Sequence, residues 1–173
     1  MKRAWTLLLP LLVLCAIPAR AQQAPAASPL AVTATNRTLD AEAARGAPRP
    51  DDHVRAGDVL RYRLTFTNTV GRPVRGVNLS NPLPQSFRFV GGSVRSSRDD
   101  ARPEYSADGG RTFSAQPMEE VVVEGRRVRR PVAPERYTNV RWTVDGWVAP
   151  GATVTAEFDA RLAGTAGTSP GAR

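Results

Sequence analysis

Four carboxylates lie close together between residues 99 and 108, and such a group could bind calcium. They are Asp99, Asp100, Glu104 and Asp108. Calcium takes six to eight oxygen ligands, and these four residues do not follow the alternating spacing of known calcium loops. Arginines at positions 98, 102 and 111 lie among them and would compete with a cation. The sequence favours salt bridges, and a calcium site in the region Asp99–Asp108 remains open.

Asp108 is followed by two glycines, and this short run lies between Tyr105 and Phe113. Asp-Gly-Gly is favoured where the backbone adopts a positive φ, because glycine has no Cβ and aspartate can hydrogen-bond its own turn. The stretch therefore predicts the tip of a β-hairpin.

Residues for catalysis are scarce. His53 is the only histidine and Cys15 the only cysteine. A triad needs a nucleophile, a base and an orienting group. Asp51, Asp52 or Asp58 could orient His53, but no serine lies in a Gly-x-Ser-x-Gly sequence. A zinc site with one histidine and no other cysteine than Cys15 would need carboxylates for nearly all its ligands, which is unusual. A pair of carboxylates of the glycosidase type is an open alternative, because the sequence does not show which carboxylates are neighbours in space. We predict a non-enzyme with no catalytic, cofactor-binding or metal-binding residues.

A basic run begins at Gly125, directly after an acidic one. The run holds Arg126, Arg127, Arg129 and Arg130, and it follows Glu119, Glu120 and Glu124. One interpretation is a solvated hairpin whose two strands carry opposite charge and pair with each other. The other is a patch for sulfated, phosphorylated or carboxylated polymers, whose oxygens suit the guanidinium fork. The first is favoured, and the four arginines are the candidate anion-binding site.

The first 21 residues have the anatomy of a signal peptide. Lys2 and Arg3 precede an apolar run, Ala4–Ile17, and Ala-Arg-Ala ends at Ala21. The pattern predicts cleavage after Ala21. A lipoprotein signal at Cys15 is disfavoured, because a leucine precedes it. We expect an exported protein, periplasmic or extracellular, with no membrane span in its mature form and no nucleic-acid partner.

The expected mature chain has 152 residues, about one domain. It retains no cysteine and carries 21 arginines against 16 acidic residues, a net charge of +5. A chain of this length can bury a core without disulfides. The arginine excess suits either a GC-rich genome, the favoured explanation, or attraction to anionic partners.

Alternating apolar and polar residues indicate strands through most of the chain. The clearest segments are residues 58–68, 139–144 and 153–162, and weaker ones are 30–35, 76–81, 86–91, 93–97 and 119–125. The pattern predicts burial of Leu60, Tyr62, Leu64, Phe66, Trp142, Val154 and Phe158. Residues Arg37–His53 are predicted to be a long loop. Residues 145–151 could form either a tight hairpin turn at Asp145-Gly146 or one longer loop, and the Pro150-Gly151 pair favours the loop.

Seven to nine short strands, separated by Gly, Pro and Asn turns, predict an all-β fold, an antiparallel β-sandwich. The predicted organisation is a signal peptide at 1–21, a flexible lead-in at 22–29, the sandwich domain at 30–163 and a disordered tail at 164–173.

Several blocks of sequence resemble a known family. "VRAGDVLRYRLTFTN" and "GRPVRGVNLSNPLPQSFRFVGGS" contain an Ala-Gly-Asp turn, a strand that ends in Asn and an Asn-Pro-Leu-Pro stretch. Together with "YSADGGRTF" and the segment "RYTNVRWTVDGWVAPGATVTAEFDARL", they resemble the bacterial conserved-repeat domain, the eleventh of the domains of unknown function. The resemblance spans Val54–Leu162.

The resemblance implies an immunoglobulin-like sandwich with a structural or spacer role in the cell envelope and no assigned active site. Many members are tandem arrays, whereas this sequence contains one unit. Two kinds of binding partner are expected as alternatives. One is an anionic polysaccharide, and the other is an envelope protein to whose sheet edge this protein adds a strand.

Overall fold

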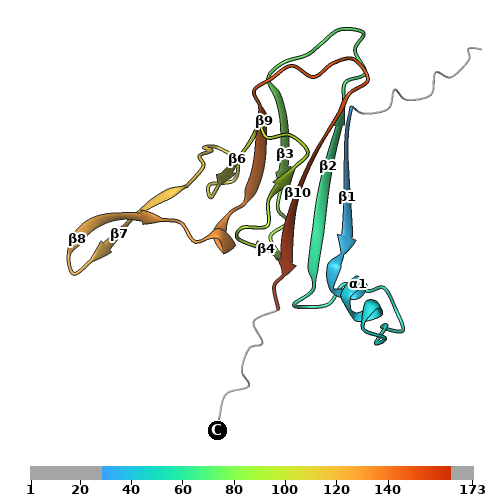
Figure 1. Cartoon of the computed structure of the whole chain (residues 1–173). Coiled ribbons are helices and arrows are strands. Elements are labelled where there is room, and N and C mark those ends of the chain that lie inside the picture. The colour runs from blue at the N-terminus through green and yellow to red at the C-terminus, as the bar shows by residue number, and fades with distance from the viewer. Residues whose placement is uncertain (1–28, 165–173) are drawn as a thin grey trace, which may run out of the picture.

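The computed structural model describes residues 29–164 of the chain. The predicted signal peptide with its cleavage after Ala21, nearly all of the lead-in and nearly all of the tail lie outside these residues. The described part is mostly β, with ten antiparallel strands in several sheets and one short α-helix (Figure 1). No helix among residues 29–164 is long and apolar enough to cross a membrane.

The largest sheet has five strands. Its order is β1 (Leu30–Asn36), β2 (Val59–Thr67), β10 (Thr153–Leu162) and β4 (Phe87–Phe89), with β5 (Arg95–Ser96) also paired to β10. The second sheet has the order β3 (Val77–Pro82), β9 (Asn139–Val144) and β6 (Ala101–Ser106). Each strand turns alternate side chains to one face, so the two-residue period becomes an apolar inner face on both sheets.

One hydrophobic cluster joins the two sheets. Trp142 of β9 and Phe158 of β10 are both buried, with ring centroids 6.2 Å apart. The predicted core is confirmed, since Leu60, Leu64, Trp142, Val154 and Phe158 are buried, and Tyr62 and Phe66 pack against the cluster while half-buried.

The polar residues of β2 and β10 pair on the opposite face of their sheet. Arg61 lies opposite Asp159 in the register, and its Nε donates to that carboxylate over 2.8 Å. Arg63 lies opposite Glu157, and its Nε donates over 2.6 Å. Opposite charges at facing positions support the register that buries the apolar face.

The predicted loop at Arg37–His53 is wrong for its first eight residues, which form the helix α1 (Arg37–Ala44). The Asn36 side chain caps the helix by accepting from the backbone N–H groups of Thr38 and Leu39. No residue of α1 is buried. Without an apolar face, the helix has no periodic pattern for the sequence to reveal.

Strand β6 was not predicted, because Pro103 lies within it and proline cannot donate to a ladder. The structure accommodates Pro103 since β6 is an edge strand, the last in its sheet order.

The strand expected at 93–97 is reduced to Arg95–Ser96. The loop expected at 145–151 is confirmed, because β9 ends at Val144 and β10 starts at Thr153 in the other sheet. The short 3-10 helix η1 (Pro134–Arg136) precedes β9.

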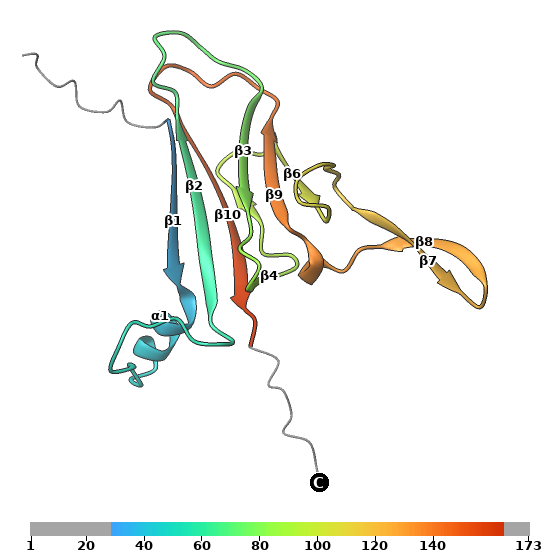
Figure 2. The same cartoon turned by 180° about the vertical axis from the view of Figure 1, so that it is seen from behind.

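The two remaining strands form a separate sheet, which projects from the two larger sheets. They are β7 (Met118–Val123) and β8 (Arg126–Pro131), and we call this hairpin the arm. We call the two larger sheets with their connecting loops the body. In both views the arm extends away from the two larger sheets (Figures 1 and 2).

Candidate functional site

The stretch around Asp108 is a hairpin tip, as predicted. Tyr105 and Ser114 exchange two backbone hydrogen bonds, at 2.8 and 3.0 Å. Gly109 and Gly110 have φ angles of 77° and 87°, in the region where glycine carries no steric cost.

Both oxygens of Asp108 are engaged within this turn. Oδ2 accepts from the hydroxyl of Thr112 at 2.6 Å, and Oδ1 accepts from the hydroxyl of Ser106 at 2.7 Å. Oδ1 also accepts from the backbone N–H groups of Arg111 and Thr112, each at 3.0 Å. These bonds, the one from the Thr112 hydroxyl foremost, hold the pKa of Asp108 well below its usual range. The carboxylate organises the turn.

The neighbouring carboxylates form separate ion pairs. Arg98 donates to both oxygens of Asp100 at 2.7 Å, and this hydrogen bonding lowers the pKa of Asp100 to about 2. Glu104 pairs with Arg141 of the adjacent strand at 2.7 Å. Within residues 29–164, no three His, Cys, Asp or Glu side chains are grouped to hold a metal ion.

The structure does not assemble a triad at His53. Asp51 Oδ1 accepts from the backbone N–H of His53 rather than from its imidazole, and Asp51 Oδ2 pairs with Arg55. Asp58 is 2% exposed and accepts two hydrogen bonds from Arg49 and one from Asn36. These bonds, with that from Arg49 foremost, lower the pKa of Asp58 far below its usual value.

Asn68, directly after β2, is a buried and fully hydrogen-bonded residue that the strand pattern did not predict. It is 1% exposed. Its Nδ2 donates to the carbonyls of Arg72 and Val148, each at 2.9 Å, and its Oδ1 accepts from the Val70 N–H at 3.0 Å. Asn68 thus ties the loop after β2 to the loop before β10. The signal available in the sequence is its place in the Asn-ending strand of the resemblance.

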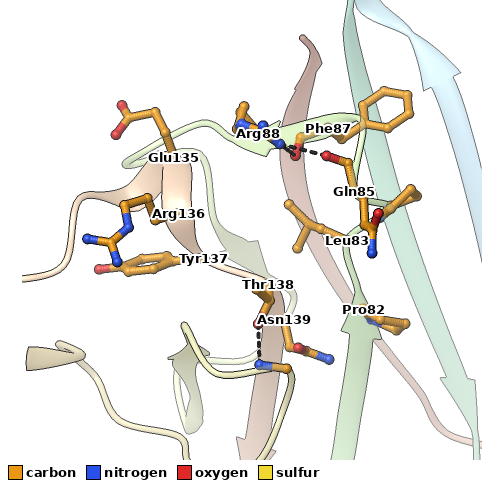
Figure 3. A pocket seen from close by; sticks show the side chains of 12 residues that line it. Pro82, Leu83, Gln85, Phe87, Arg88, Glu135, Arg136, Tyr137, Thr138 and Asn139 are labelled. Carbon is orange, nitrogen blue, oxygen red and sulfur yellow. Dashed lines mark hydrogen bonds between the residues drawn. The ribbon is translucent and has the colours of Figure 1, made fainter. Parts of the chain in front are cut away.

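A depression of about 540 Å³ lies beside η1 (Figure 3). Leu83, Phe87 and Tyr137 give it an apolar lining, while Arg88 and Arg136 reach it from different segments (Figure 3). Arg88 Nη1 donates to the carbonyls of Gln85 and Phe87. Sequence reasoning did not find this depression, because its walls come from residues 82–88 and 135–139.

The arm carries all four candidate anion-binding arginines. Strands β7 and β8 place Glu119 opposite Arg130 and Glu120 opposite Arg129. The hairpin of opposite charges is therefore confirmed. Arg127 lies 3.9 Å from Glu120.

Glu119 fixes the base of the arm. It pairs with Arg130 at 3.0 Å and with Arg136 of η1. The pKa of Glu119 is lowered by these partners, with Arg136 contributing most. At the same end, Val132 is buried and its N–H donates to Pro117. The arm is thus attached firmly at its root.

Towards its tip the arm exposes apolar side chains. Val122 is 70% exposed, Val123 50%, and Val128 of the facing strand 41%. All six residues of β8 are exposed. Val123 and Val128 lie on one face of the ribbon and Val122 lies on the other, because Val128 pairs with Val121 and successive residues of a strand alternate faces. Exposed apolar side chains that lie next to one another often mark a contact surface.

No family model and no curated protein matches this chain. The resemblance described above remains a prediction.

Proposed function

We propose that this protein is a non-catalytic interaction module of the bacterial cell envelope, exported by its N-terminal segment. In this proposal the two larger sheets form an immunoglobulin-like sandwich, and the arm contacts a partner. The observation that carries the proposal is the arm, which leaves Val122, Val123 and Val128 in solvent while its root is held by Glu119. Such a hairpin adds little to the core and is suited to binding.

The absence of an enzymatic role is supported by how the acidic residues are used. Asp108 holds a turn, and Asp58 and Asp100 are hydrogen-bonded to arginines. Each of these carboxylates has a lowered pKa. A general acid at neutral pH requires the opposite shift.

Site-specific photo-cross-linking in cells tests the contact role. A photoreactive residue at position 122 is expected to give a small number of defined adducts. The control is position 70, because Val70 is 48% exposed but lies on the body. Equal adduct patterns from the two positions, or none from position 122, would refute the arm as the contact element.

Export is tested separately. Cell fractionation should recover the protein in the periplasm or the medium, and mass spectrometry should find Gln22 as its first residue. A cytoplasmic protein that retains Met1 would contradict export.

The second candidate function is binding of an anionic glycan by the arm. It is favoured by the exposure of Arg126, Arg127, Arg129 and Arg130 on one strand. Dextran sulfate should then bind with an affinity that falls as salt rises. Charge reversal at all four positions should abolish binding, whereas reversal of the exposed Arg95 and Arg111 on the body should not. Indifference to salt and to these changes would rule this function out.

A further inference from the structure

The two outer edges of the arm differ in chemistry. Among residues 29–164, β7 and β8 pair only with each other, so each has one edge without a strand partner. An edge strand with unpaired backbone groups is a template for another strand. A two-stranded ribbon is also marginally stable alone, so a third or fourth strand would stabilise the arm.

Strand β8 is protected against pairing with its own copy. Two β8 strands aligned antiparallel about Val128 would place Arg127 opposite Arg129 and Arg126 opposite Arg130. Like charges at facing positions are destabilising. Shifting the centre to Arg127 or Arg129 would place that arginine opposite itself. The strand also contains Pro131, which cannot donate a ladder hydrogen bond.

Strand β7 has one register in which it is compatible with its own copy. Two β7 strands aligned antiparallel about Val121 place Glu119 opposite Val123 and Glu120 opposite Val122. No glutamate then faces a glutamate. Centring the pair on Glu120 would place that residue opposite itself, and centring it on Val122 would place Glu120 opposite Glu124.

We propose that two copies of this chain associate through their β7 edges, antiparallel about Val121, to form a four-stranded sheet from two arms. The proposal rests on the proposed function, in which the arm is the contact element, and it names a second copy as the partner.

The register gives this sheet a continuous apolar row. Val128 lies opposite Val121 within one arm, and Val121 lies opposite Val121 of the second copy. The row therefore contains four valines from four strands. In the flanking rows a valine of one copy faces a glutamate of the other, and an arginine lies at each end of the row. Val123 and Arg126 of one copy line up with Glu119 and Arg130 of the other.

Cysteine cross-linking tests the register. Facing Cα atoms in antiparallel strands lie about 4.5–5.5 Å apart, within the range that a disulfide spans. In a Cys15→Ser background, Val121→Cys should give a disulfide-linked dimer on mild oxidation, because position 121 faces itself.

The matched control is Val128→Cys, in the same row. Two copies of position 128 would be separated by three strand spacings, about 14 Å, and should not cross-link. Failure of Val121→Cys to cross-link, or equally fast cross-linking of Val128→Cys, would overturn the proposal.

Sedimentation velocity of the purified chain is the second test. The wild type should shift from monomer to dimer with rising concentration. Val121→Lys should remain monomeric, whereas Val128→Lys, on the far strand of the arm, should still dimerise. Circular dichroism of each variant checks that the body is folded.

The outcomes separate this proposal from the one it rests on. A wild-type chain that is monomeric at every concentration, but whose position 122 cross-links to one other protein, overturns self-pairing and leaves the interaction module standing. A monomeric chain with no specific adduct from position 122 overturns both.

Discussion

Replacing Asn68 with alanine should destabilise the body of the protein, because the buried Asn68 side chain is hydrogen-bonded to two loops. Its side chain makes three hydrogen bonds, to Arg72, Val148 and Val70. Its backbone makes two more, because its N–H donates to Ala152 and its carbonyl accepts from the Gly151 N–H. Alanine keeps the backbone bonds and loses the other three.

The expected cost follows from the number of bonds. At about 1 kcal/mol for each hydrogen bond lost, Asn68→Ala should lower the free energy of unfolding by about 3 kcal/mol. For a domain of this size, 1 kcal/mol corresponds to about 2–4 °C, so Tm should fall by about 6–12 °C. Asn68→Asp should cost at least as much, because it turns a carboxylate oxygen towards the carbonyls of Arg72 and Val148.

Urea unfolding followed by tryptophan fluorescence measures the change, since Trp142 is 1% exposed in the folded protein. The matched control is Asn78→Ala. Asn78 is exposed, and its two side-chain hydrogen bonds lie at the surface: its amide donates to the Gly76 carbonyl at 3.3 Å, and its Oδ1 accepts from the Thr143 hydroxyl at 2.9 Å. The control should stay within about 0.5 kcal/mol of the wild type. An Asn68→Ala protein as stable as the Asn78→Ala protein would refute the argument that Asn68 holds the two loops together.

Three further predictions concern Asp58, Asp108 and Gly146. Because the pKa of Asp58 is lowered in the folded protein, its ionised carboxylate stabilises the fold at pH values above the ordinary aspartate pKa of about 4. This stabilisation is lost as the pH falls below that value. The stability gap between wild type and Asp58→Asn, from urea midpoints at several pH values, should therefore narrow towards pH 2; a constant gap would contradict this. Asp108→Ala should increase the hydrogen-exchange rate of the Thr112 amide, by NMR, more than that of the Leu79 amide in the core; unchanged exchange at Thr112 would contradict the turn. Gly146→Ala should lower Tm, because the added Cβ would collide with the Asp100 carboxylate. Gly71→Ala is the control and should leave Tm unchanged, because the space around Gly71 is open. Equal Tm values for the two variants would show that residue 146 does not lie so close to Asp100.

Local side-chain alternation was enough to predict the strands of the core. Leu60 and Leu64 of β2 and Phe158 of β10 belong to runs in which every second residue is apolar, and all three are buried as predicted. Asp108 with its two glycines was enough to predict the hairpin tip, because positive φ is a property of the residues themselves. Opposite charge in adjacent runs was enough to predict the β7–β8 hairpin.

The elements that escaped the sequence depend on contacts between distant residues. Helix α1 has no buried face, and the side chain that begins it, Asn36, is also bonded to Asp58, 22 residues away. The cavity beside η1 is walled by segments about 50 residues apart. Neither the helix nor the cavity is encoded by a periodic pattern of apolar residues within one continuous segment.

The sequence by itself determined the main strands of the two larger sheets, the apolar face of each of them and the turn at Asp108, because these depend on neighbouring residues. Tertiary structure alone decided that Asp58 and Asn68 are buried anchors, that Asp100 and Glu104 bind separate arginines, and that the arm stands away from the body. Those outcomes depend on which distant donors and acceptors meet when two sheets pack, and no spacing along the chain records that.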